Sequence, residues 1–284
     1  MIREIGRREM LGALGIGALM RVAHAADDAP RYSMLDHLEF FVSDVEKSTA
    51  FYAQVFGSRL FGNPVMKNNR TTRRYVRLGT GYMAIDSGPQ LRVDHICAGV
   101  AGFQVASMHS FLEQRGVAYR DYPSGKDLSI GDPDGGVRLQ LAADKGWDAL
   151  AGGTASPESV RVEGNAVFRP LGLDHILLNV PDPEKSATFY EKVLGPVAQR
   201  NDNRIWFQVG RSSRIGLLKT PEGQKAGVNH FCVASAGFDY GAAAQKLVQV
   251  GAKVEMPELA GAPEFRDPDG YLIQVIARAE ITDH

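Results

Sequence analysis

The chain contains the same set of three residues twice, and this internal repeat constrains the fold more than any other feature. In each half, two histidines are followed by a glutamine, at separations of 58 and 45 residues in the first half and 55 and 44 in the second. Each histidine ends a short sequence of the form LDH, VDH or VNH, and each glutamine follows a DPDG turn. The repeat predicts two copies of one site, formed by His37, His95, Gln140, His175, His230 and Gln274.

The repeat extends to the segments around the first histidine of each half. Residues 35–57 and 173–195 both predict a strand, then an amphipathic helix, then a glycine that ends the helix. We expect a capping box over residues 43–46 in the first copy and a cap at Asp182 in the second. The two halves are therefore predicted to share one local structure.

Short strands follow each of these helices, and the pattern starts again at the second histidine of each half. Each half is thus predicted to contain two strand–helix–strand–strand–strand modules. Residues 145–167 are rich in Gly, Ala and Ser and are expected to link a domain at 32–144 to a second domain at 168–279.

Two sequences in the second half are the most specific, LDHILLNVPDPEKSATFYEKVLG (173–195) and FRDPDGYLIQV (265–275). Together with the repeat they resemble the vicinal oxygen chelate superfamily, which includes glyoxalase I, extradiol ring-cleavage dioxygenases, and the bleomycin and fosfomycin resistance proteins. The resemblance implies an α+β fold of two tandem domains. Each domain would consist of two βαβββ modules curled around an open cup.

The same resemblance implies a metal site in each cup. The superfamily takes ligands from the first strand of each module and from the last strand of the second. These positions correspond to His37, His95 and Gln140 in one cup and to His175, His230 and Gln274 in the other. Two histidines and one oxygen ligand, with open positions for substrate, suit Fe(II) best, and Zn, Mn, Ni or Co can also occupy such a site.

The glutamines depart from the superfamily pattern. Its dioxygenases carry glutamate at this position, and its metal-binding glyoxalases add a fourth ligand from the last strand of the first module. A neutral amide oxygen binds a cation less strongly and leaves the centre more positive, which favours an anionic oxygen chelate as substrate. The alternative is that the six residues line a metal-free binding cup.

Other residues near the predicted ligands are candidates for catalysis or binding. Glu39 lies two residues after His37, so it shares the inward strand face and could act as an acid or base; it could equally be a carboxylate at the rim. Arg74, from a cluster of three arginines, and Arg204 are the candidates for binding an anionic substrate, against the alternative of a solvated strand face.

The two cysteines occupy equivalent positions in the two halves. Cys97 and Cys232 each lie two residues after a predicted ligand histidine, so both thiols should adjoin the ligands inside their cups. They could be redox-sensitive groups there, or simply small buried residues. A disulfide between them is not expected, because equivalent positions in two cups should be far apart.

The first 25 residues have the features of an export signal. Arg7 and Arg8 precede an uncharged stretch of Leu, Gly and Ala, and Ala23 to Ala25 offers a small-x-small cleavage site. The twin arginine resembles a Tat signal, which predicts a periplasmic protein; an ordinary Sec signal is the alternative. The apolar stretch is too short to span a bilayer, so no stable membrane anchor is expected.

The composition narrows the function classes. A net charge of -1 without a basic cluster excludes nucleic acid as a partner, and two cysteines exclude a disulfide scaffold. A small-molecule substrate is therefore expected, and a homodimer stays open. Three hypotheses follow: a metal-dependent enzyme resembling extradiol dioxygenases, a lyase or isomerase of glyoxalase type, and a non-enzymatic binding protein of the bleomycin-resistance type.

Overall fold

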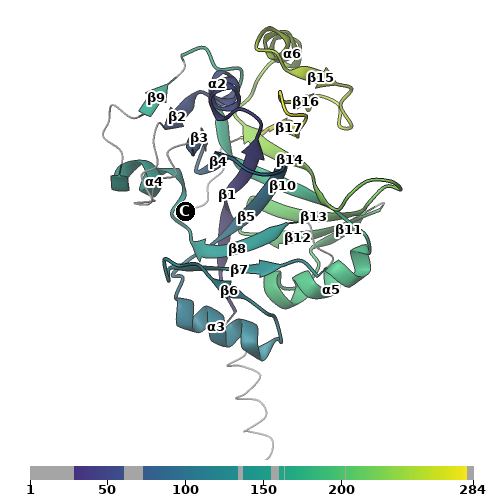
Figure 1. The fold of residues 1–284 in the computed structure, drawn as a ribbon. Helices are drawn as coiled ribbons and strands as arrows, with labels where there is room; N and C mark the ends of the chain where they lie inside the picture. Colours follow the sequence, from purple (N-terminus) through teal and green to yellow (C-terminus); the bar gives the residue numbers. More distant parts are fainter. Residues whose placement is uncertain are drawn as a thin grey trace, which may run out of the picture.

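The structure, a computed structural model, describes residues 29–60, 73–133, 137–154, 160–162, 164–201 and 203–279. The export signal expected at residues 1–25 lies outside these ranges. Two mixed β-sheets with few helices form the described part of the molecule, which is the tandem βαβββ fold that the repeat predicts (Figure 1). None of the helices in these ranges is both long and apolar enough to cross a membrane.

The first sheet has nine strands in the order β6-β7-β8-β5-β1-β4-β3-β2-β9. The elements of this half are β1 (Tyr32–Val42), α2 (Val45–Phe56), β2 (Ser58–Leu60), β3 (Arg74–Leu78), β4 (Gly81–Ser87), β5 (Arg92–Val100), α3 (Val105–Gln114), β6 (Arg120–Asp121), β7 (Asp127–Gly131), β8 (Arg138–Ala143), α4 (Gly146–Thr154) and β9 (Val160–Val162). The two modules meet at β1 and β5, which pair antiparallel; β4 runs parallel to β1, and β8 parallel to β5.

The second sheet repeats this arrangement with eight strands in the order β11-β12-β13-β10-β14-β17-β16-β15. Its elements are β10 (Pro170–Val180), α5 (Pro183–Leu194), β11 (Gln199–Asn201), β12 (Arg204–Val209), β13 (Ser213–Lys219), β14 (Gly227–Ser235), α6 (Tyr240–Gln249), β15 (Lys253–Glu255), β16 (Glu264–Arg266) and β17 (Leu272–Ala277). β10 and β14 pair antiparallel at the centre, as β1 and β5 do in the first sheet.

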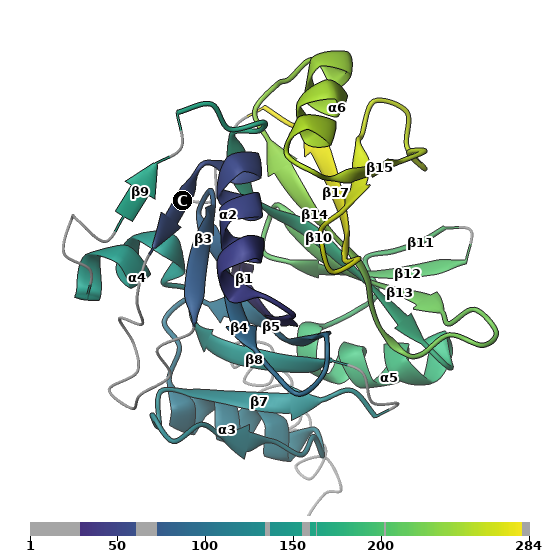
Figure 2. The same ribbon diagram turned by 45° about the horizontal axis from the view of Figure 1, so that its top comes forward.

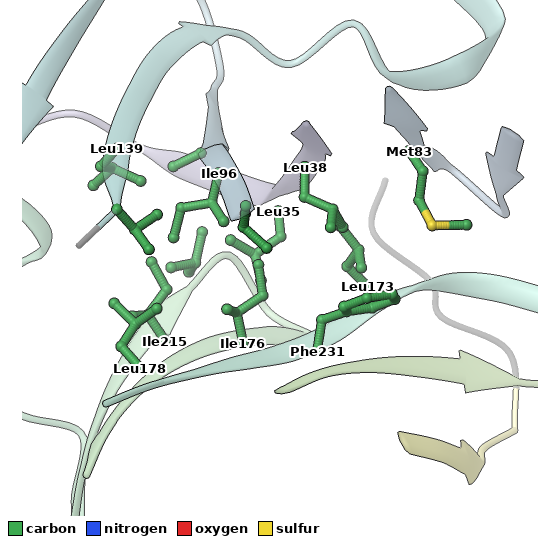
Figure 3. Packing of buried hydrophobic residues seen from close by; sticks show 14 of the residues in the cluster. Leu35, Leu38, Met83, Ile96, Leu139, Leu173, Ile176, Leu178, Ile215 and Phe231 are labelled. Atoms are coloured by element: carbon green, nitrogen blue, oxygen red, sulfur yellow. The ribbon is translucent and has the colours of Figure 1, made fainter. Parts of the chain in front are cut away.

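The two sheets pack against each other through one shared hydrophobic core. Leu35, Leu38 and Ile96 of the first sheet face Leu173 and Ile176 of the second, and all five are at most 1% exposed (Figure 3). Successive strand residues point to opposite faces, so the histidines next to these leucines and isoleucines lie on the outer faces. The candidate sites therefore open away from the shared core.

The helix ends agree with the expected caps, with one difference. Asp44 caps α2 by accepting the backbone N–H of Lys47, and Asp182 caps α5 ahead of Pro183. Residues 43–46 do not form a capping box: Ser43 donates its hydroxyl to Asp269 in the other half, and Glu46 pairs with Arg74. Asp44 alone thus forms the local cap, while the turn of the second half binds Ser43.

The two halves are joined by matching contacts at the DPDG turns. Tyr52 of α2 donates its hydroxyl to Asp267 at 2.8 Å, and Tyr190 of α5 makes the equivalent hydrogen bond to Asp132. Both tyrosines are at most 1% exposed. Each half therefore satisfies a buried polar group of the other, and a shared core with such contacts makes the halves one packed unit.

The segment expected to be a linker contains regular structure. Residues 145–167 include α4 and β9, and β9 pairs with β2 at the edge of the first sheet (Figure 2). Trp147 and Leu150 of α4 are buried against Tyr75 and Tyr82 of the first sheet. The alanine- and glycine-rich composition indicated a loop, but this packing stabilises a helix.

Candidate metal centres

Each pair of histidines is brought together by the antiparallel pairing at the centre of a sheet. His37 lies on β1 and His95 on β5, and His175 and His230 occupy the same places on β10 and β14. In both sheets the register shifts by one residue immediately before the first histidine. Such a bulge changes the direction of a side chain, and the shift at the same place in both halves puts the two imidazoles edge to edge.

In the first cup the three candidate ligands converge. The Nε2 atom of His37 lies 3.3 Å from Nε2 of His95 and 3.1 Å from Oε1 of Gln140. All three residues are at most 8% exposed. The predicted set of the first half is therefore assembled at one point.

The second cup has the same central feature. The Nε2 atoms of His175 and His230 are 3.1 Å apart, and Gln274 lies on β17, which runs parallel to β14 with Gln274 opposite Cys232. In the first cup, Gln140 lies opposite Cys97 in the same way. Hence the sequence repeat corresponds to a repeated geometry.

The outer nitrogen of each imidazole faces an oxygen acceptor. Nδ1 lies 2.7 Å from Asp36 in His37, 3.1 Å from Asp94 in His95 and 2.7 Å from Asp174 in His175. In His230 it lies 2.9 Å from Oδ1 of Asn229. An oxygen acceptor at Nδ1 favours the tautomer in which Nε2 carries no proton and can bind a metal ion.

Two lone pairs that face each other at 3.1 to 3.3 Å repel unless a cation or a proton lies between them. Burial lowers the pKa of His95 to about 4 and that of His230 to about 3, so both rings are neutral near pH 7. Ligands bound at about 2.1 Å and at right angles lie about 3 Å apart, close to the observed spacing. The residues present therefore fit a divalent metal ion in each cup.

A carboxylate orients each candidate glutamine ligand. In the second cup the side-chain N–H of Gln274 donates to Oε1 of Glu264 on β16 at 2.8 Å. In the first cup, Gln140 makes a side-chain hydrogen bond to Asp127 on β7. Since the amide nitrogen is held by a carboxylate, the amide oxygen is left to face the histidines, as Oε1 of Gln140 does.

Sequence reasoning missed Glu264 and Asp127. Glu264 is 8% exposed and lies directly opposite Gln274, whereas the residue opposite Gln140 is Ser129. A comparison of the two halves therefore shows no repeated acid at this place. The signal that could have found them is an acid on the strand before each glutamine.

Glu39 lies in the first cup, as its strand position predicted. One of its carboxylate oxygens is 3.9 Å from Nδ1 of His95, and the other accepts a hydrogen bond from Arg73 at 2.5 Å. Burial raises the pKa of Glu39, and the Arg73 guanidinium opposes this. Arg73 also donates its Nε–H to Asp86 at 3.2 Å. The Arg73 guanidinium thus bridges the two carboxylates.

The structure does not bring Arg74 into the cup. Arg74 lies on the opposite face of β3 from Tyr75, and its guanidinium pairs with Glu46 at 2.6 Å at the start of α2. The arginine of the cluster that reaches the first cup is its neighbour, Arg73. A shift of one residue along a strand exchanges the two faces, and the sequence alone does not show which of the two arginines faces the cup.

Arg204 does lie at the second cup. It shares a strand face with Trp206, whose ring meets the edge of His175 at 5.2 Å between centroids, and its charge is close enough to lower the pKa of His230. Arg204 is the counterpart of Arg73 in the strand register. Tyr82 and Arg214 are the partners of the first histidine in each half, and they pair in turn with Arg77 and Gln208. Arg73 and Arg204 lie four residues before Arg77 and Gln208, respectively.

Both thiols lie beside the candidate ligands. Cys97 is opposite His37 and Cys232 is opposite His175, and each sulfur lies within 4.8 Å of candidate ligand atoms of that histidine and the aspartate before it. Both cysteines are free and fully buried. Burial raises the pKa of each thiol well above its usual value, so both are neutral thiols near pH 7.

Neither half places an acid beside the first histidine at the position where a fourth ligand is expected. In the first cup this position is Tyr82, whose ring stacks on His37 at 4.6 Å. In the second it is Arg214, whose guanidinium stacks on Trp206. Asp86, the acid of that strand, is engaged by Arg73. In the described residues, neither cup therefore has an unengaged acid beside its first histidine.

Comparisons with known proteins agree with this fold. Residues 34–91 and 172–275, more than half of the chain, match the model of the Glyoxalase/Bleomycin resistance protein/Dioxygenase superfamily. The chain belongs to this superfamily.

Individual relatives lie on two branches of the superfamily. The lactoylglutathione lyase of Schizosaccharomyces pombe is 23% identical, over 85% of this chain and 95% of the relative. The Mn(II)-bound glyoxalase from Novosphingobium aromaticivorans is 18% identical, with a TM-score of 0.63 over 87% of this chain and 83% of its own.

The 2,3-dioxygenase LapB from Pseudomonas sp. KL28 is 17% identical, with a TM-score of 0.66 over 90% of this chain and 96% of its own. At these identities the solved structures establish the shared fold. The choice between glyoxalase and dioxygenase chemistry has to come from the site.

Proposed function

We propose that the protein is a metal-dependent enzyme whose substrate chelates the ion through two neighbouring oxygens, with chemistry that resembles that of the extradiol dioxygenases. The observation that carries the proposal is the pair of buried Nε2 atoms that lie 3.1 to 3.3 Å apart in each cup, with a glutamine on the next strand. His, His and one oxygen ligand leave room for two substrate oxygens, and an Fe(II) ion there would act as a Lewis acid.

The protein's own residues would position this ion and disfavour the histidine tautomers that cannot bind it. Asp36, Asp94, Asp174 and Asn229 hold the histidines in the tautomer that can ligate. Candidates for moving a proton near the metal are Glu39 in the first cup and Glu264 in the second, both buried carboxylates. Tyr271, three residues before Gln274, does not serve in proton transfer, because its hydroxyl donates to the backbone oxygen of Phe41 in the other half.

A lyase or isomerase of glyoxalase type is the second candidate. It is favoured by the similarity to a lactoylglutathione lyase along 85% of the chain, and by the neutral glutamine ligand. The absence of an acid at the fourth-ligand position in the described part of both cups favours the dioxygenase-like site instead.

We further propose export by the twin-arginine signal at residues 1–25. A folded protein can carry its metal through that pathway, so the ion would be loaded before export. The measurement is the cellular fraction in which the protein is found when Arg7 and Arg8 are both replaced by Lys. Retention in the cytoplasm is expected, and unchanged export would contradict the proposal.

The experiment on function begins with metal content. The full chain, purified without chelators, should contain metal, and His37→Ala and His175→Ala should each remove one of two equivalents. Full metal content in both variants would refute the ligand assignment. Oxygen uptake by the Fe(II)-loaded protein with a panel of catechols then tests the reaction class, and isomerisation of a hemithioacetal without oxygen uptake would favour the glyoxalase-type alternative.

A further inference from the structure

The two cups carry the same candidate ligands but differ in how they hold their arginine. In the first cup, Arg73 donates to both Glu39 and Asp86. At the corresponding places the second cup has Leu177 and Leu218. Arg204, the counterpart of Arg73, therefore lacks both of the carboxylates that occupy the first guanidinium.

One donor of Arg204 is left without a partner. Its Nε–H is buried and makes no hydrogen bond with any residue that the structure describes. An unsatisfied buried donor of a charged group is unfavourable, and this cost disappears when an acceptor binds. The guanidinium can thus donate one further hydrogen bond, through Nε, to an oxygen atom of a ligand.

The remaining partner of Arg204 comes from a distant strand connection. Glu258, in the segment between β15 and β16, pairs with the Arg204 guanidinium, and its backbone N–H donates to Glu264 at 3.2 Å. β12 and β16 are separated by four strands in the sheet order, so this ion pair joins distant parts of the second sheet. Glu258 is 56% exposed, and an ion pair of this kind contributes little and exchanges easily.

The two cups also differ in the side chains that pack beside their first histidine. In the first cup, Trp147 and Leu150 of α4 pack on Tyr75 and Tyr82. In the second, the equivalents of these tyrosines are Trp206 and Arg214, and the Arg214 guanidinium lies over the Trp206 ring. The Arg204 side chain is 23% exposed and that of Arg73 12%, so Arg204 is the more accessible of the two arginines.

We propose that the second cup binds a substrate that carries a carboxylate in addition to its two metal-chelating oxygens, and that Arg204 binds this carboxylate in exchange for Glu258. A carboxylate is chosen because the group that occupies Arg204 in the structure is itself a carboxylate, delivered by another segment of the chain. The Arg204 fork can bind two carboxylate oxygens at once, which would also satisfy its Nε–H. This inference rests on the proposed metal-dependent function and assigns its substrate class.

The test is a binding measurement, so that it does not depend on turnover. The full chain is loaded with Zn(II), which undergoes no redox chemistry, and titrated by calorimetry with 4-methylcatechol and with catechols that carry a carboxylate on a chain of none, one or two methylene groups. We expect the best carboxylated catechol to bind roughly 10- to 100-fold more tightly than 4-methylcatechol, as for a hydrogen-bonded charge pair.

Three variants assign the effect to Arg204. Arg204→Gln should abolish the preference for the carboxylate, and binding of 4-methylcatechol by the Zn(II)-loaded variant would show that it is folded. Glu258→Gln should strengthen binding of the carboxylated catechol, because the competing carboxylate is removed. The matched control is Arg74→Gln, since Arg74 lies on the other face of its strand and should leave both affinities unchanged.

The outcomes separate this inference from the proposed function. If 4-methylcatechol binds and Arg204→Gln keeps the preference, or if the wild-type protein shows none, the substrate class is wrong and the metal-dependent function stands. If no catechol binds to the Zn(II)-loaded protein, the inference fails together with the dioxygenase-like function.

Discussion

Gln274 donates its side-chain N–H to Glu264 across two neighbouring strands at 2.8 Å, and this contact determines which end of the amide faces the histidines. Relatives with glutamate at this position would have a carboxylate on the last strand. Here the carboxylate is that of Glu264, on the neighbouring strand β16. The site thus keeps a negative charge beside the candidate ligands while presenting a neutral oxygen to the ion. Gln140 and Asp127 have the same relationship in the first cup.

Replacement of Glu264 by Gln should weaken metal binding in the second cup. Without the carboxylate, the Gln274 amide loses the acceptor that orients it, and loss of such a supporting group costs roughly 10- to 100-fold in metal affinity. Competition titration with a metal-binding dye would measure this on the His37→Ala background, where only the second cup is filled. Glu255→Gln, on the adjacent strand, is the control; equal affinity in both variants would show that Glu264 does not orient the ligand.

An exchange of the two residues tests the same relationship more directly. Gln274→Glu alone puts a second carboxylate at hydrogen-bond distance from Glu264, so one of them must bind a proton and the gain in metal affinity should be small. The double variant Gln274→Glu with Glu264→Gln should bind metal more tightly than either single variant. A double-mutant cycle of dissociation constants is expected to give a coupling of at least about 1 kcal/mol, and additivity would refute the argument.

The sequence predicted the parts of the site that are repeated and local. The histidines and glutamines recur at matched positions, and a strand period of two placed Glu39 in the correct cup. Arg74 was selected in place of Arg73 because the sequence does not reveal which residue of a strand begins the inward face. Which residues of β3 face the cup depends on how β3 pairs with β4, and this pairing is part of the tertiary structure.

The features that the sequence did not predict depend on contacts between distant segments. Glu264 has no acid as its counterpart in the first half, so the repeat could not mark it. The helix α4 is stabilised by Trp147 and Leu150 against the first sheet, although its composition indicated a loop. Ser43 was expected in a local cap, but Asp269 of the other half binds it.

The tyrosines that join the two halves should contribute to stability. Tyr52→Phe leaves an oxygen of Asp267, a residue that is 5% exposed, without its donor, and this should reduce the free energy of unfolding by about 1–3 kcal/mol. Tyr190→Phe should act similarly through Asp132. Urea unfolding provides the measurement. Tyr119→Phe, whose hydroxyl donates to exposed Glu113, should change stability by less than about 0.5 kcal/mol, and equal losses in all three variants would argue against the contacts.

Gly210 lies very close to the backbone of the other half. Its φ is +66°, and a Cβ at this position would lie 1.7 Å from the backbone oxygen of Ser33 at the start of β1. Gly210→Ala should therefore destabilise the protein through two effects, the left-handed backbone and the clash. Gly223→Ala isolates the first effect, because Gly223 has a φ of +77° and nothing within 4 Å of its Cβ position. Conformational strain alone costs about 1 kcal/mol, so thermal unfolding should show a clearly larger loss for Gly210→Ala. Equal melting temperatures for the two variants would mean that the turn after β12 can move away from β1 at no cost.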